Sequence, residues 1–294
     1  MTPDTRFLGL PKPFWAFVRL IGQECGYTKR GTGELHVPSR KVVEKQLDKI
    51  GITPASLDAI LPEGVPTWDK LVEYFAYRAD LLLNMVEPNL MDVTQAKKEF
   101  TALKKKLKPK CPLPMNKQKG KMRAPAYLTC MVNMLIESVV KGQECDYDPR
   151  ALATVMRDGN PLRTFARRMD GAFPSVLNPV AVWEIKEYYY TTTFGSRVAD
   201  GVYETLLDGM EIEELATAEN IDVLHYLIID AHYTWWSCGK SYLCRIVDML
   251  HMGYVDEVLI GREILTRLPF LVKEWIGQGV SPKNLVIPER PVRA

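Results

Sequence analysis

Two short stretches of the sequence carry residue types that could act together on a phosphate ester. The first, residues 167–171, contains Asp170 beside a glycine, and the second, residues 180–186, ends in Glu184 and Lys186. Two carboxylates that converge on one point form an oxygen site for a hard divalent cation, usually Mg2+. A lysine beside that site can hold the attacking water or stabilise the negative charge that grows on a phosphate. These residues are therefore suited to metal-assisted hydrolysis of a phosphodiester.

The second stretch alternates as a β-strand does, with every other residue on the same face. Two valines precede Glu184 and Lys186 on one face, whereas Trp183 and Ile185 lie on the other. We therefore expect the strand to begin in the core and its end to emerge with a carboxylate and an ammonium group side by side. Asp170 stands fourteen residues before Glu184, a gap that suits a neighbouring strand joined by a turn.

This arrangement resembles the PD-(D/E)XK motif of a nuclease superfamily, and in particular its type II restriction endonucleases, over about residues 127–260. The resemblance implies a core of one helix, a three-stranded meander, a second helix and a further strand. It also implies that Asp170 and Glu184 are metal ligands, that Lys186 is the catalytic lysine, and that the cofactor is Mg2+, for which Mn2+ can substitute. Met169 stands where the motif has a proline, and the family tolerates variation there.

The family often adds an acidic residue from the helix that precedes the motif. Glu137 lies at the edge of the apolar stripe of an expected helix over residues 127–140, so it is the candidate for a fourth catalytic residue. The alternative for Glu137 is an exposed helix residue without a role.

A basic segment divides the chain. Residues 101–136 contain no Asp or Glu, and several prolines interrupt any helix beyond about residue 107. We expect an α-helical N-terminal region over residues 1–108, which helps to select DNA, a linker or DNA-contacting loop over 109–125, and a nuclease domain over 126–294. In the middle segment the expected DNA contacts are Lys117, Lys119, Lys121 and Arg123. The alternative for this segment is a solvated linker.

A second phosphate site is expected after the motif strand, where residues 191–197 would open the next helix. Free N–H groups, the Ser196 hydroxyl and the Arg197 guanidinium could bind a DNA phosphate there. The alternative is plain capping of the helix by Thr193 or Ser196.

The apolar periodicity predicts an α/β protein. Helices are expected at 14–21, from Ser39 to Ile50, and at 68–85, 93–107, 127–140, 195–207, 240–252 and 263–275. Strands are expected at 180–190, 223–233 and 257–260. Together with the resemblance, this order predicts a restriction-endonuclease-like mixed sheet flanked by helices.

Composition excludes several classes of protein. The 294 residues are 47% hydrophobic, which is typical of a globular chain, and 38 Lys and Arg against 36 Asp and Glu give a net charge of only +2. The six cysteines have no zinc-site spacing, and Thr234 stands where a P-loop before Gly239-Lys240-Ser241 needs glycine, so no nucleotide cofactor is expected. Apolar runs are shorter than the ~20 residues that span a bilayer, and no signal peptide is evident, so we expect a cytoplasmic protein.

We therefore expect a Mg2+-dependent DNA endonuclease, most simply a type II restriction enzyme that cuts double-stranded DNA at a short site. By analogy with that family we expect a homodimer, since two active sites cut two strands. Two alternatives stay open: a structure-specific repair or recombination nuclease, and a DNA-binding protein without catalysis.

Overall fold

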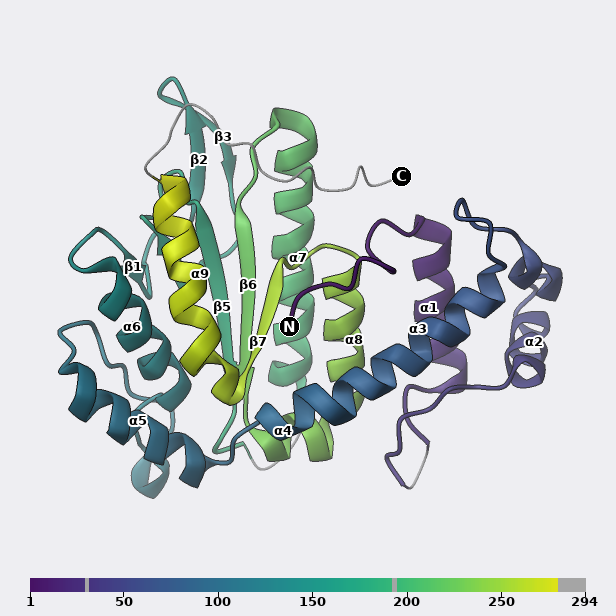
Figure 1. Ribbon diagram of the computed structural model, residues 1–294, viewed down its shortest axis with the longest axis horizontal. Helices are drawn as coiled ribbons and strands as arrows, with labels where there is room; N and C mark the ends of the chain where they lie inside the picture. The colour runs from purple at the N-terminus through teal and green to yellow at the C-terminus, as the bar shows by residue number, and fades with distance from the viewer. Residues whose placement is uncertain (30–31, 192–194, 280–294) are drawn as a thin grey trace.

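A five-stranded sheet forms the centre of the larger part of the molecule (Figure 1). The computed structural model describes residues 1–29, 32–191 and 195–279. The sheet order is β1-β4-β5-β6-β7, with antiparallel pairing from β1 to β5 and parallel pairing from β5 to β7. The strands are β1 (Asp146–Tyr147), β4 (Gly171–Phe173), β5 (Ala181–Glu187), β6 (Leu224–Asp230) and β7 (Glu257–Ile260).

Helices cover both faces of this sheet, so the expected α/β class with a mixed sheet and flanking helices is confirmed. On one face α6 (Tyr127–Val140) and α9 (Ile264–Gly279) share a core with β5 and β7. On the other face α7 (Ser196–Glu219) and α8 (Lys240–His251) pack against β5, β6 and β7. α5 (Val93–Leu107) packs outside α6 and adds Phe100 to the first core.

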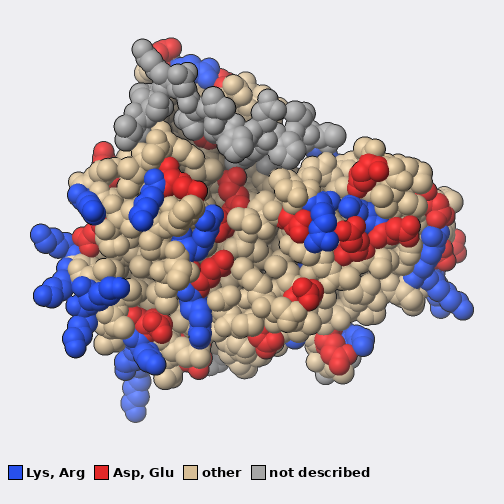
Figure 2. All heavy atoms as spheres, in the orientation of Figure 1, with Lys and Arg blue, Asp and Glu red and all other residues tan. Residues whose placement is uncertain are grey.

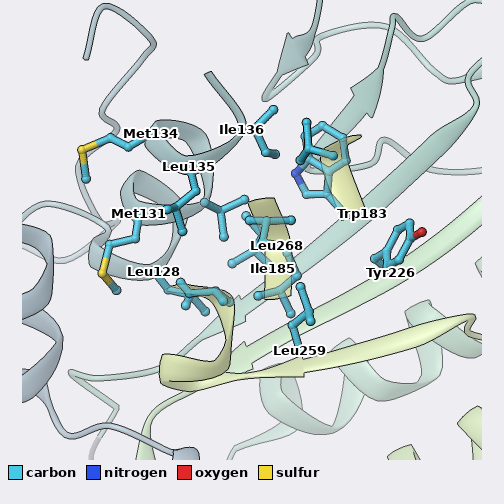
Figure 3. Close-up of a cluster of buried hydrophobic side chains, with 14 of the residues drawn as sticks. Leu128, Met131, Met134, Leu135, Ile136, Trp183, Ile185, Tyr226, Leu259 and Leu268 are labelled. Atoms are coloured by element: carbon cyan, nitrogen blue, oxygen red, sulfur yellow. The ribbon is translucent and has the colours of Figure 1, made fainter. Parts of the chain in front are cut away.

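The expected alternation along β5 is confirmed by what each side chain contacts. Trp183 and Ile185 lie in the core beneath α6 and α9, among side chains such as Leu128 and Leu268 (Figure 3). Val182 packs on the opposite face, in the cluster that α7 completes. Since Glu184 and Lys186 share that second face, β5 directs its two charged side chains at α7.

Gly171 explains why a glycine follows Asp170. In the register of β4 with β5, Gly171 pairs with Trp183, whose indole lies directly against the glycine. A Cβ on residue 171 would lie 2.0 Å from Trp183 Cζ2. The indole has little room to move, because it is fully buried and stacks on Trp275 with ring centroids 5.5 Å apart. Residue 171 must therefore lack a side chain if Trp183 is to fill the core.

The N-terminal region is helical, as expected, and has a core of its own. Its elements are α1 (Lys12–Cys25), α2 (Arg40–Lys49), the 3-10 turn η1 (Pro54–Asp58), α3 (Thr67–Leu81), the π turn η2 (Leu82–Val86) and α4 (Glu87–Asn89). A buried ion pair ties this region to the sheet domain. Arg78 of α3 donates to Asp248 of α8 at 2.8 Å, and the Tyr74 hydroxyl donates to the same carboxylate oxygen at 2.6 Å.

The division expected at residue 108 differs from the one in the structure. α5 contributes to the core of the sheet domain, and the connection before it is fixed by Asp230, whose carboxylate accepts the Met91 N–H at 2.7 Å. The N-terminal region therefore ends near residue 90, because the apolar face of α5 is buried against α6. Residues 280–294 of the expected nuclease domain lie outside the described residues.

Other differences are local. The hairpin of β2 (Thr154–Arg157) and β3 (Asn160–Thr164) was not expected, and α7 continues twelve residues beyond the predicted end at Leu207. Short turns complete the chain at η3 (Gly120–Met122), η4 (Tyr233–Cys238) and η5 (Gly261–Glu263). Within the described residues, no helix has the length and apolar character needed to cross a membrane.

The contact between Gly171 and Trp183 leads to a prediction about stability. Gly171→Ala should lower the free energy of unfolding by about 1–3 kcal/mol, the usual cost of overpacking a filled core. Gly277→Ala is the control, since that glycine of α9 faces open space and alanine favours helix. Urea denaturation of both variants checks this, and a Gly171→Ala protein as stable as the wild type would contradict it.

Candidate active site

The charged residues of β5 meet two carboxylates from α7. Lys186 Nζ lies 2.9 Å from Glu184 Oε2 on its own strand and 2.9 Å from Glu204 Oε2 on α7. Glu184 and Asp208 are fully buried, and Lys186 is only 9% exposed. The end of β5 therefore does not emerge into solvent as expected, because α7 covers it.

Arg167, in the loop between β3 and β4, joins the same cluster. Its Nη1 atom lies 2.8 Å from Glu184 Oε1 and 2.6 Å from Asp208 Oδ2, and its Nη2 atom lies 3.3 Å from Glu204 Oε2. One guanidinium group thus contacts three carboxylates, in the forked geometry that suits arginine.

Asp170 lies beside this cluster, at the start of β4. Its N–H donates to the Trp183 carbonyl at 3.1 Å, and its Oδ2 atom accepts the Ile185 N–H at 2.7 Å. Burial and the nearby charge of Glu184 raise the pKa of Asp170 to about 6. The charge of Glu184 therefore reaches Asp170, so the two carboxylates of the motif lie near each other.

The protonation states follow from burial and from these contacts. Burial opposes the charge on Lys186, but Glu184, Asp170 and Glu204 outweigh it and hold the pKa of the ammonium well above its ordinary value. Burial raises the pKa of Asp208 to about 7, against the opposing effect of Arg167. At neutral pH Lys186 is therefore a fixed positive charge and cannot accept a proton.

The cluster contains residue types that bind hard divalent cations, but they are not arranged as a metal site. Asp170, Glu184, Glu204 and Asp208 bring four carboxylates against the two positive charges of Arg167 and Lys186. Carboxylate oxygens are the ligands that Mg2+ takes in proteins. Among the described residues, however, no three acidic, histidine or cysteine side chains converge in the geometry of a metal site. The cluster's carboxylates are directed at Arg167 and Lys186 instead.

Solvent reaches this region through a hollow of about 330 Å³. Asp170 and Arg167 line its inner side, and Lys117, Asp148 and Arg168 complete the wall with Met169. The hollow therefore brings three positively charged side chains next to a motif carboxylate. Such a wall suits an anionic ligand such as a phosphate.

The basic segment is an ordered loop that reaches the hollow. Asn116 closes the loop: its N–H donates to the Ala124 carbonyl, and its side chain bonds the Met122 carbonyl and the Ala124 N–H. Lys117, Lys119, Lys121 and Arg123 are all exposed on the loop, and Lys117 lines the hollow. The lysines of α5 are exposed too, and Figure 2 shows positive side chains gathered at the end of the molecule where Figure 1 draws α5.

Two of the other predicted site residues have different surroundings. Both carboxylate oxygens of Glu137 accept the Lys110 N–H, at 3.1 and 3.0 Å, so Glu137 holds the preceding segment onto α6 and does not join the cluster. Ser196 is exposed and opens α7 without capping it through its side chain. Thr193 and the side chain of Arg197 lie outside the described part of the chain.

Sequence reasoning missed Glu204 and Asp208. Both fall on the α7 face that packs on β5, where Val198, Ile212 and Leu215 are buried. A carboxylate at a helix position that spacing assigns to the core is rare unless it has a charged partner. This signal could not identify Asp208, because the predicted helix ended at Leu207, one residue before it.

The sequence profile of a family described as Domain of unknown function (DUF7687) matches residues 91–275, more than half of the chain. The chain belongs to the DUF7687 family. A second profile, Domain of unknown function (DUF7690), matches residues 1–85. No curated protein and no solved structure matches the chain. The break between the two profiles coincides with the connection that Asp230 fixes, and the DUF7687 region contains the whole charged cluster.

Glu187, the last residue of β5, adds a buried carboxylate to the DUF7687 region near this cluster. Its Oε2 atom accepts the Leu128 N–H at the start of α6 at 2.6 Å. Burial, opposed by that bond and reinforced by the charges of Asp230 and Asp170, raises the pKa of Glu187 to about 8. The folded protein therefore keeps a proton that the unfolded chain releases above about pH 4.5.

This difference predicts a pH dependence of stability. Glu187 makes its full contribution to the free energy of unfolding below about pH 4.5. This contribution is lost as the pH rises to about 8, because the folded state must then bury a charged carboxylate. Glu187→Gln removes the titration, so the variant should gain stability over the wild type as the pH rises from 5 to ~9. Urea denaturation across that range checks it, with Glu144→Gln, an exposed carboxylate, as the control. Parallel profiles for wild type and Glu187→Gln would show that the carboxyl is not held neutral.

Proposed function

We propose that this protein is a Mg2+-dependent DNA endonuclease of the PD-(D/E)XK kind. One observation carries the proposal: Asp170, at the edge of the Glu184–Lys186 cluster, opens onto a hollow that is also lined by Lys117 of the basic loop. Lys117 and Asp170, 53 positions apart in the sequence, thereby bring a cation that can bind phosphate next to a carboxylate that can bind a metal. Neither the overall charge of the chain nor the Glu184–Lys186 pair at the end of a strand would by itself favour this arrangement.

The residues divide into distinct roles under this proposal. Asp170 and Glu184 would hold the cation, which when bound supplies a Lewis acid and lowers the pKa of water. Lys186, held in its charged form by three carboxylates, positions the attacking water and stabilises the negative charge that grows on the phosphate. Arg168 and Lys117 orient the DNA backbone at the mouth of the hollow.

The proposed biology is cleavage of double-stranded DNA at a short specific site by a homodimer, as in type II restriction enzymes. The exposed cations of the basic loop support DNA as the partner. Plasmid cleavage separates this from a repair or recombination nuclease, because site-specific cutting leaves discrete bands and structure-specific cutting requires junctions or flaps.

A second candidate, a DNA-binding protein without catalysis, is favoured by a different observation. Glu184 is paired with both Lys186 and Arg167, as in structural ion pairs. For that candidate the expected result is a gel shift without cleavage at any Mg2+ concentration.

The first prediction from the proposal concerns Asp170. Asp170→Asn keeps an oxygen for the Ile185 N–H but removes the charge, so it should slow single-turnover cleavage by at least ~10²-fold while DNA binding persists. Asp148→Asn is the matched control, because Asp148 lines the same hollow but is exposed. If Asp170→Asn cuts plasmid with Mg2+ as fast as the wild type, the site assignment is wrong.

The second prediction concerns the basic loop. Replacing Lys117, Lys119, Lys121 and Arg123 together by alanine should weaken binding to all DNA sequences alike. The slope of log K against log salt should fall by about 0.9 for each DNA phosphate that the variant no longer neutralises. Fluorescence anisotropy at several salt concentrations measures the slope, and Lys273→Ala, an exposed lysine of α9 outside the loop, should leave it unchanged. An unchanged slope in the loop variant would show that the segment is a linker that does not contact DNA.

A further inference from the structure

The charge of the chain is distributed unevenly along the sequence. Residues 93–136 contain eleven lysines and arginines but a single acidic residue, Glu99. The rest of the chain contains 27 lysines and arginines against 35 acidic residues, so the net charge of +2 conceals a strongly basic region. Five of the eleven cations lie on α5, two in the turn after it and four on the basic loop. All eleven are exposed, and no described residue forms an ion pair with any of them.

α5 presents lysines along the side that does not pack on α6. Phe100 is buried in the core that α5 shares with α6. Lys97 and Lys104 are seven residues apart, as are Lys98 and Lys105, so the members of each pair share a face of the helix about two turns apart. The four lysines therefore form a positively charged strip along the exposed side of α5.

The strip adjoins the segment that begins the basic loop. The Cys130 thiol of α6 donates to the Pro114 carbonyl at 3.4 Å, just before the loop. Burial raises the pKa of this thiol to about 12, and the nearby positive charge of Lys104 opposes the rise. Lys104 and Pro114 therefore lie near the same side chain. The α5 strip and the basic loop form one basic surface, at the end of the molecule where Figure 2 shows positive side chains gathered.

The stability of α5 accounts for only part of this surface. Lysines in the last turn of a helix interact favourably with the helix dipole, which explains Lys104, Lys105 and Lys106. Lys97 and Lys98 lie in the first half of α5, where the dipole does not favour positive charge, and the cations of the basic loop lie outside the helix. Like charges on one surface repel each other, so an anionic ligand explains the remaining cations better than folding does.

This surface fits the phosphate backbone of a nucleic acid better than it fits a lipid bilayer. A helix that binds a membrane surface inserts its apolar face among the lipids, but the apolar face of α5 is already buried against α6. A row of phosphates requires only exposed cations along its length. From Lys97 to Lys105 the helix rises by ~12 Å, the length of roughly three to four base pairs of a duplex.

We propose that the exposed lysines of α5 bind the phosphate backbone of double-stranded DNA, so that α5 and the basic loop form one continuous DNA-binding surface. The choice of DNA as the nucleic acid rests on the proposed function. The contact itself requires neither a metal ion nor the charged cluster of β5 and α7. DNA that reaches the hollow beside Lys117 is then held by α5 as well. Since the contacts are to phosphates, they do not depend on the base sequence.

Binding of duplex DNA to the full chain in EDTA, measured by fluorescence anisotropy at several salt concentrations, tests the inference. The α5 variant carries three changes that keep a good helix former at each position: Lys97→Ala, Lys98→Ala and Lys105→Ala. The slope of log K against log salt should fall by at least ~1.8, since about 0.9 is lost with each phosphate contact and the strip makes two or more. The fall should be the same for every DNA sequence.

A matched control removes the same charge from α2, which lies at the opposite end of the molecule from α5 in Figure 1. Its three changes are at exposed lysines: Lys41→Ala, Lys45→Ala and Lys49→Ala. The control should leave the slope unchanged. An unchanged slope in the α5 variant, or an equal fall in the control, overturns the inference.

The outcomes separate this inference from the proposed function. Because EDTA removes divalent cations, cleavage does not enter the measurement. If binding depends on α5 but the wild type never cuts plasmid with Mg2+, the proposed function fails and the inference stands. If α5-dependent binding is tighter to duplex RNA or to phosphatidylserine vesicles than to duplex DNA, the inference fails. Should the alanine variant not fold, as judged by circular dichroism, glutamine at the same three positions is measured with the same expectation.

Discussion

The buried charge of Glu184 is the constraint on which the arrangement around β5 depends. A carboxylate in the centre of a sheet, covered by a helix, is tolerated only when cations compensate it, and removing one partner of a buried pair costs about 3–5 kcal/mol. Lys186 and Arg167 provide that compensation from the strand itself and from the loop before β4. Glu204 and Asp208 of α7 contact the same two cations. The ion pairs around Glu184 therefore join a strand, a loop and a helix.

The apolar face of β5 determines where this charge lies in the molecule. Trp183 is packed between Gly171 and Trp275, which fixes both β4 and α9 relative to the strand. Because Asp170 immediately precedes Gly171, the packing of an indole ring also sets the position of a motif carboxylate. The core residues and the charged residues therefore lie on opposite faces of β5, and a displacement of the strand would move both sets.

Local patterns predicted most of the fold, and long-range contacts explain what they missed. α5, α6 and β7 begin and end where the periodicity places them, because each has an uninterrupted apolar repeat. The pairing of Asp170 with the Glu184 strand was also predictable, since it depends on alternation and on a short connection. The burial of Lys186 was not, because it depends on how α7 packs across β5, a contact between segments that local sequence patterns do not specify. Glu137 satisfies a backbone N–H at Lys110, a partner that no spacing rule identifies.

The buried pair of Arg78 and Asp248 has a mechanical consequence. Arg78 is also enclosed by the rings of Tyr27, Tyr74 and Phe75, all from the N-terminal region, so the guanidinium that reaches Asp248 is held in a desolvated site of its own region. A hinge cannot form where a charged group would have to leave such an environment. We therefore expect the N-terminal region and the sheet domain to move as a unit, because separating α3 from α8 would leave Arg78 and Asp248 buried without their partners.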